Sequence, residues 1–140
     1  MSTRAEKYTQ LQKIPDLFSD FTTCLNPHPI TKDLIRLREE QSIKQSIKNL
    51  VLTVTGERPF NARIGSTVNR SLFEFNDDFT SQSIVSSITE SITTNEPRVA
   101  LIDVIATPRP DDYSYDVRIL YTIINTRIPQ SIDLVLRRVR

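Results

Sequence analysis

The chain has 140 residues, 38% hydrophobic and 25% charged, and its 18 lysines and arginines nearly balance its 17 aspartates and glutamates. This length fits one domain whose core buries roughly two-thirds of the unfolded surface, and the near-neutral charge argues against nucleic acid or an anionic membrane as a partner. Because no stretch approaches the roughly 18 uninterrupted apolar residues of a membrane span, and no apolar run follows the basic N-terminal residues, we expect neither a membrane anchor nor a standard export signal.

The beginning of the chain is polar and offers few core-forming side chains. Residues 1–32 contain three of the eight prolines and only a short aromatic pair, Phe18 and Phe21. Such a stretch is typical of an extended arm. We therefore predict an N-terminal arm over residues 1–32 and a single domain over residues 33–140.

A first amphipathic helix is predicted from about Arg38 to about Val54. Its apolar residues recur at the spacing i, i+4, i+7 and i+8, and they are Ile43, Ile47, Leu50 and Val51. Gly56 is expected to end this helix with a positive φ, which glycine adopts at little cost. Since Gly56 and Gly65 are the only glycines, both are expected to mark special backbone positions.

A short second helix is predicted after the segment that holds the two glycines. Ser66 is placed to cap this helix, and Val68 and Leu72 would form its apolar face. The next two aromatic residues, Phe73 and Phe75, are predicted to anchor in the core.

A third helix is predicted over residues 81–94, with Thr80 or Asp78 as its cap. Its apolar stripe consists of Ile84, Val85, Ile88 and Ile92. The serines and threonines over the rest of the helix are mediocre helix formers, so packing must hold it in place.

Beyond Pro97 the hydrophobic period changes from 3.6 to 2, which predicts strands. The segment after Pro97 is apolar on both faces except at Asp103, so we expect a strand that is covered on both sides. Residues 108–112 are dense in turn formers, and clean alternation over residues 113–123 and again after Pro129 predicts two more strands. Helices followed by an antiparallel meander of three or slightly more strands define an α+β fold with helices on one face of the sheet.

Few residues could support metal binding or catalysis. Cys24 is the only cysteine and His28 the only histidine, which excludes an internal disulfide and a Cys/His zinc site. His28 stands between two prolines in a polar loop, and we interpret it as a solvent-facing spacer. No glycine-rich phosphate loop is present. We predict no catalytic, cofactor or metal-binding residue.

One enzymatic hypothesis stays open beside the structural one. Glu57, Glu74 and Glu96 lie near predicted helix ends, and a peptidoglycan-cleaving glycosidase needs only two carboxyl groups at a set separation. The simpler interpretation is capping and ion pairing, because Glu57 adjoins Arg58 and Glu96 nearly adjoins Arg98.

Three segments together resemble a known family. SIKNLVLTVTGERPF (46–60), GSTVNRSLFEFND (65–77) and NEPRVALIDVIATP (95–108) are similar, in that order and near that spacing, to the baseplate wedge family of contractile-tailed phages. Members are also called sheath initiators or tail lysozymes, and they are related to a type VI secretion baseplate subunit. The resemblance covers roughly residues 17–140. The chain departs from it after Phe60, where residues 61–65 replace the family's common PEFG-like run.

The resemblance implies a structural, non-enzymatic subunit of the virion tail, assembled in the host cytoplasm in sixfold copies within the baseplate. Such a subunit would sit beside the tail tube, bind a helical core bundle of other wedge proteins, and offer a sheet to the tail sheath protein. The family fold also resembles the conserved domain of the sheath protein, which agrees with the helices-then-meander order.

The resemblance also implies which residues meet partners. Glu96, Pro97 and Arg98, here termed the EPR motif, would grip the wedge bundle, with Glu57 and Arg58 nearby. Pro97 fixes the exit from the third helix and therefore the direction of both charged side chains. The alternative is that Glu96 and Arg98 form an internal ion pair that closes the corner between helix and strand.

A three-stranded meander leaves two edges whose unpaired N–H and C=O groups can accept a foreign strand. We predict that sheath strands add beside residues 131–138, at Leu134, Val135 and Leu136, or at the opposite edge.

Overall fold

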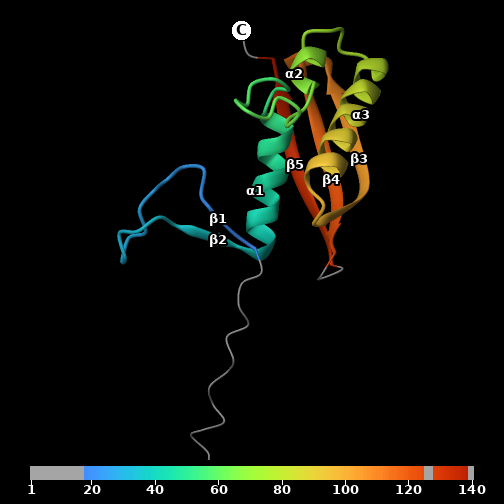
Figure 1. Ribbon diagram of the computed structural model, residues 1–140. Coiled ribbons are helices and arrows are strands. Elements are labelled where there is room, and N and C mark those ends of the chain that lie inside the picture. Colours follow the sequence, from blue (N-terminus) through green and yellow to red (C-terminus); the bar gives the residue numbers. More distant parts are fainter. Residues whose placement is uncertain (1–17, 125–127, 139–140) are drawn as a thin grey trace, which may run out of the picture. The chain divides into compact units, whose positions relative to one another are not determined.

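The structure is a computed structural model that describes residues 18–124 and 128–138 (Figure 1). It divides into two compact units, Met1–Ser42 and Ile43–Arg140. The division therefore falls further along the chain than the boundary predicted after residue 32. The first 17 residues of the predicted arm lie outside the described residues.

The first unit contains a small ribbon that the sequence did not indicate. Strands β1 (Ser19–Phe21) and β2 (Arg36–Arg38) pair antiparallel. An isolated bridge continues the pairing at Pro27 and Leu34. A two-stranded ribbon is marginally stable by itself, because it has too few neighbours to bury its side chains. Accordingly Phe21, Leu25 and Ile30 are exposed.

The second unit has the predicted order of helices followed by strands. The helices are α1 (Glu39–Leu52), which begins before the division, α2 (Val68–Ser71) and α3 (Asp78–Asn95). The strands are β3 (Val99–Arg109), β4 (Ser114–Ile123) and β5 (Pro129–Arg137), with a short 3-10 helix, η2 (Pro110–Asp112), between the first two. They form an antiparallel sheet in the order β3-β4-β5, which confirms the α+β prediction. Among the described residues, no helix is long and apolar enough to cross a bilayer.

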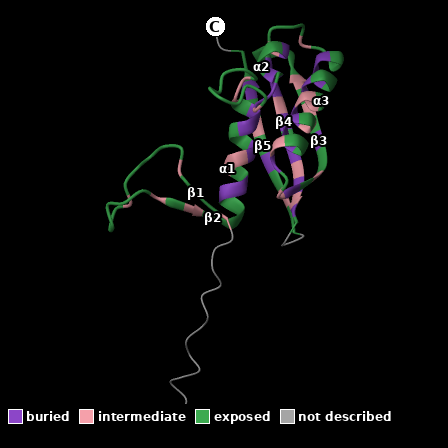
Figure 2. Ribbon diagram, in the orientation of Figure 1, coloured by how far each residue is buried: buried purple, intermediate pink, exposed green. Residues whose placement is uncertain are grey.

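The core lies between the helices and one face of this sheet. Helix α1 contributes the four predicted apolar residues, all buried, and α3 contributes Ile84, Ile88 and Ile92. Alternation along β4 buries every second residue from Tyr115 to Ile123, as predicted. Figure 2 shows these buried segments along α1 and the central strand. Burying such side chains contributes about 1.5–3 kcal/mol each, so this layer supplies most of the driving force for folding.

Strand β3 is covered on one face only, which corrects the prediction of a strand buried on both sides. A β-bulge shifts the pairing with β4 between Leu101 and Asp103. The extra residue places Val104 in the core and leaves Ile102 and Ile105 on the open face, where they are 56% and 47% exposed. The open face of the sheet thus carries apolar side chains as well as two ion pairs, Arg109–Asp116 and Arg118–Asp133.

The predicted helix caps were wrong. The Ser66 hydroxyl donates to the Val51 carbonyl instead of capping α2. Helix α3 is capped by Asp77, whose side chain accepts from the Thr80 N–H at 2.8 Å. The hydrogen bond from Thr80 lowers the pKa of the Asp77 carboxyl.

Two aromatic assignments were also wrong. Phe73 and Phe75 are exposed and do not anchor the core. Tyr113 precedes β4 in a left-handed conformation with an exposed ring, so the alternating pattern of β4 begins after it.

Candidate functional site

The EPR motif forms the corner between α3 and β3. The Glu96 N–H donates to the Ile92 carbonyl, which closes the last helical turn, and the Val99 N–H donates to the Glu96 carbonyl. Pro97 has no N–H to continue the helix, and its ring disfavours helical backbone at Glu96. The corner is thus set by backbone chemistry, as the sequence predicted.

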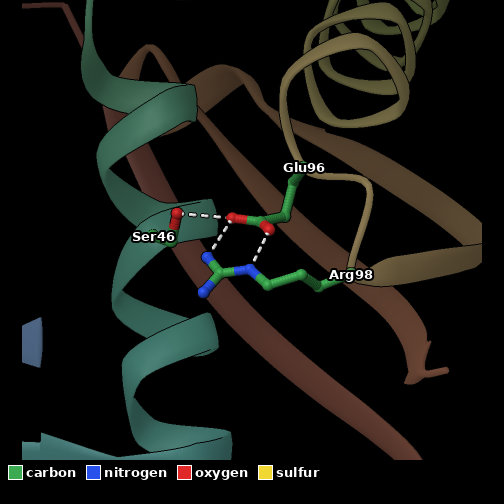
Figure 3. Close-up of polar contacts among 3 residues, drawn as sticks. All are labelled: Ser46, Glu96 and Arg98. Atoms are coloured by element: carbon green, nitrogen blue, oxygen red, sulfur yellow. Dashed lines mark hydrogen bonds and ion pairs between the residues drawn. The ribbon is translucent and has the colours of Figure 1, made fainter. Parts of the chain in front are cut away.

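The structure brings Glu96 and Arg98 together in a bidentate ion pair (Figure 3). Arg98 Nε donates to Glu96 Oε1 at 2.5 Å, and Arg98 Nη2 donates to Oε2 at 2.7 Å. Ser46, on the facing turn of α1, donates its hydroxyl to Oε2 at 2.6 Å. Three charge-assisted hydrogen bonds therefore hold one carboxylate.

The pair is asymmetric in its access to solvent. The Glu96 side chain is 3% exposed, whereas Arg98 is 32% exposed. Burial is the largest influence on the Glu96 pKa and raises it, but the hydrogen bonds from Arg98 and Ser46 and the guanidinium charge outweigh that effect and lower the pKa overall. Glu96 is consequently ionised at neutral pH, and Arg98 is the member of the pair that a partner can reach.

The loop after α1 holds the other two predicted partner-binding residues. Gly56 and Gly65 both have positive φ, +96° and +126°, as expected of special backbone positions. Gly56 does not end the helix as predicted, because α1 already ends at Leu52. Glu57 Oε2 accepts from the Val54 N–H at 3.1 Å, which tightens the turn. Within the described chain no ion pair joins Glu57 to Arg58 or to the EPR motif, and both side chains are exposed.

The predicted docking strand is an edge of the sheet. Within the described residues, β5 pairs only with β4, in an unbroken register from Ser114↔Arg137 to Thr122↔Pro129. Leu136 points into the core, Leu134 is half-buried, and Val135 is 57% exposed on the open face.

The glutamates do not form an obvious acid–base pair. A glycosidase needs one carboxyl group with a raised pKa as proton donor, whereas the Glu96 pKa is lowered. Glu57 is engaged in its own turn, and Glu74 is exposed beyond α2. Across residues 18–124 and 128–138, no group of histidine, cysteine and acidic side chains has the arrangement of a metal site.

Ser46 is a member of the site that the sequence did not predict. Ser46 belongs to the segment quoted for the family resemblance, but an amphipathic pattern gives no reason to single out a serine on its intermediate face. Only the approach of α1 to the corner between α3 and β3 gives this residue a role.

Comparison with known proteins supports the family. The model of the family "Baseplate wedge protein gp25" matches residues 37–130. The baseplate wedge protein gp25 of Enterobacteria phage T4 is 31% identical over 94 residues, which are 67% of this chain and 71% of the T4 protein.

Solved structures share the fold. A putative tail lysozyme from Geobacter sulfurreducens has a TM-score of 0.66 at 24% identity, over 72% of this chain and 92% of that one. A chain of the anti-feeding prophage baseplate has a TM-score of 0.60 at 22% identity, over 88% and 87%. A chain of a type VI secretion system baseplate complex has a TM-score of 0.61 at 11% identity, over 71% and 93%. The matched segment contains α1, the EPR motif and most of the sheet, and the chain belongs to the baseplate wedge protein gp25 family.

Proposed function

We propose that this protein is a structural subunit of a contractile-tail baseplate that joins other wedge proteins to the tail sheath. It would sit beside the tail tube in sixfold copies within the virion baseplate. Family membership supports the baseplate role. The observation that carries the finer assignment is the EPR corner, where a buried carboxylate holds a partly exposed arginine in one orientation.

In this proposal the two charged residues of the EPR motif, Glu96 and Arg98, have different roles. Glu96 is saturated by Arg98 and Ser46, so it orients the guanidinium and does not touch a partner itself. Arg98 presents its accessible edge to the wedge helical bundle, where the carbonyl ends and carboxylates of helices attract a cation. Arg58, exposed on the loop after α1, would add a second positive contact, and Glu57 would hold that loop in shape.

The contact of Arg98 with a partner can be separated from its internal role. Arg98→Ala leaves a buried, unpaired carboxylate, so this variant alone would confuse instability with lost binding. The double variant Glu96→Gln/Arg98→Ala removes the buried charge as well. We expect it to be more stable than Arg98→Ala and still excluded from baseplates. Normal incorporation of the double variant would mean that Arg98 serves only the corner.

We further propose that sheath strands add to β5 and not to β3. The β3 edge is interrupted by the bulge at Leu101/Asp103 and by Pro108, which lacks an N–H. Both features are ones that proteins use to prevent edge pairing. The β5 edge has neither between Gln130 and Arg137. A main-chain contact at Leu134, Val135 and Leu136 would tolerate changes of side chain.

Proline substitution tests the edge. N–H groups of successive residues in a strand point to opposite sides, so Leu134→Pro and Val135→Pro form a matched pair. One of them removes a bond to β4 and should destabilise the domain. The other removes a donor from the edge and should give a stable domain whose baseplates fail to initiate sheath. Normal sheath growth on baseplates that carry the stable variant would exclude β5 as the acceptor.

A further inference from the structure

Several phenylalanines are exposed at the end of the second unit where α3 begins. Phe73, Phe75 and Phe79 are 58%, 87% and 78% exposed, and the nearby Tyr113 is 68% exposed. Soluble domains rarely display aromatic residues so densely without a contact to make. We define these four side chains as the aromatic end.

The aromatic end is built on ordered loops. The side-chain amide of Asn76 donates to the Arg109 carbonyl at 2.8 Å, and the Tyr115 hydroxyl donates to the Phe75 carbonyl at 3.2 Å. The Asp77 cap then fixes the start of α3. These bonds join the loop before α3 to the connection between β3 and β4, so the rings are held outward by the surrounding backbone.

The same two loops are acidic. Residues 72–79 and 110–114 contain no basic residue, and their acidic residues are Glu74, Asp77, Asp78, Asp111 and Asp112. Within the described chain, Asp112 is the only one of these with an ion pair, to Arg137 at 3.8 Å. Negative charge around aromatic rings disfavours nucleic acid and anionic lipid and favours a cationic partner.

One arginine of the chain already contacts the aromatic end. The Arg138 guanidinium carbon lies 5.7 Å from the centre of the Phe73 ring, within the range of a cation–π contact. This contact indicates which chemistry suits the other rings, since Phe75 and Phe79 are exposed and directly follow the acidic residues Glu74 and Asp78 in the chain.

We propose that the aromatic end binds a segment of a neighbouring protein that carries arginine or lysine together with apolar side chains. The surface differs from the EPR motif, because Phe79 and Glu96 lie at opposite ends of α3, about 25 Å apart along the helix. It also differs from the β5 edge. The contact proposed there is made by the main chain, whereas the aromatic end consists of side chains. The protein would thus contact its neighbours through three surfaces: the EPR motif, the β5 edge and the aromatic end. A partner at the aromatic end would explain why Phe73 and Phe75 are not in the core.

Photo-crosslinking in the assembled particle tests the proposal. A benzophenone side chain at position 75 replaces one exposed ring with another, and it should crosslink within assembled baseplates to a peptide rich in arginine or lysine. The same probe at position 102, on the open sheet face, is the control and should not label that peptide. Crosslinking only to a second copy of this chain, to an acidic peptide, or to nothing would overturn the proposal.

Substitutions supply an independent measurement. Phe75→Ser/Phe79→Ser and Glu74→Lys/Asp78→Lys change exposed side chains, so melting temperatures should stay within a few degrees of the unmodified protein. Each double variant should lower incorporation into baseplates at least tenfold, whereas the exposed-site control Ile102→Ser/Glu90→Lys should incorporate normally. Full incorporation of both double variants would show that the surface has no partner.

Discussion

The Ser46 hydroxyl of α1 lies 2.6 Å from Oε2 of Glu96, which is 50 residues further along the chain. This hydrogen bond ties the first helix to the corner between the third helix and the sheet. The orientation of Arg98 therefore depends on a residue outside the EPR motif. A change in α1 can alter the EPR corner without touching its three residues.

Ser46→Ala should destabilise the domain by about 2 kcal/mol, because a buried carboxylate loses a hydrogen bond that no solvent molecule easily replaces. Chemical denaturation measures the change. Lys48→Ala, at an exposed position of the same helix, is the control and should cost a few tenths of a kcal/mol at most. Equal stabilities of the two variants would contradict the role given to Ser46.

The pH dependence of stability should report on Glu96. Its folded-state pKa is below the ordinary value of 4.5, so the ionised pair stabilises the fold above that pH and the contribution is lost as pH falls through the folded pKa. The stability difference between the unmodified protein and Glu96→Gln should hold steady from pH 7 to about pH 5 and shrink below it. The pKa of Asp77 is also lowered, but Asp77 is present in both proteins, so its contribution to the stability difference cancels. A difference that stays constant to pH 3 would contradict the lowered pKa.

The two glycines should respond differently to alanine. A Cβ at Gly56 would meet no atom within 4 Å, so Gly56→Ala costs only the strain of a positive φ, about 1 kcal/mol. Gly56→Val should cost more, because a β-branched residue tolerates that φ less well. A Cβ at Gly65 would lie 2.6 Å from the Thr53 carbonyl oxygen, so Gly65→Ala must also move backbone. Thermal denaturation should rank Gly65→Ala as the less stable alanine variant, and the reverse order would contradict the close approach at Gly65.

The bulge in β3 can be tested by placing a charge on each side of it. Val104 is 7% exposed, so Val104→Asp should cost about 3 kcal/mol or more by burying a carboxyl group. Ile102 lies on the open face, and Ile102→Asp should change stability little. A strand without the bulge would place residues 102 and 104 on the same face and make the two variants alike.

The elements that sequence predicted well are those whose pattern follows from a single buried face. The alternation from Tyr115 to Ile123 and the helical spacing from Ile43 to Val51 are direct consequences of packing one side against a core. The positive φ of Gly56 was predicted because few residues other than glycine adopt that backbone conformation.

Other features depend on tertiary structure that a hydrophobic pattern does not display. Phe73 and Phe75 look like core residues because hydrophobicity alone does not separate a buried side chain from an exposed one. The β3 bulge leaves the composition of the strand unchanged, and Asp77 competes as a cap with Asp78 and Thr80 in the same four residues. Ser46 gains its role only from tertiary contact.

A reconstruction of the assembled tail at side-chain resolution would show both proposed contacts, at Arg98 and along β5, in one measurement. We expect Arg98 to lie against the end or an acidic residue of a helix from another wedge protein, and a foreign strand to pair along β5 at residues 134–136. A map in which Arg98 faces only solvent and Glu96, and in which β5 carries no added strand, would contradict both expectations.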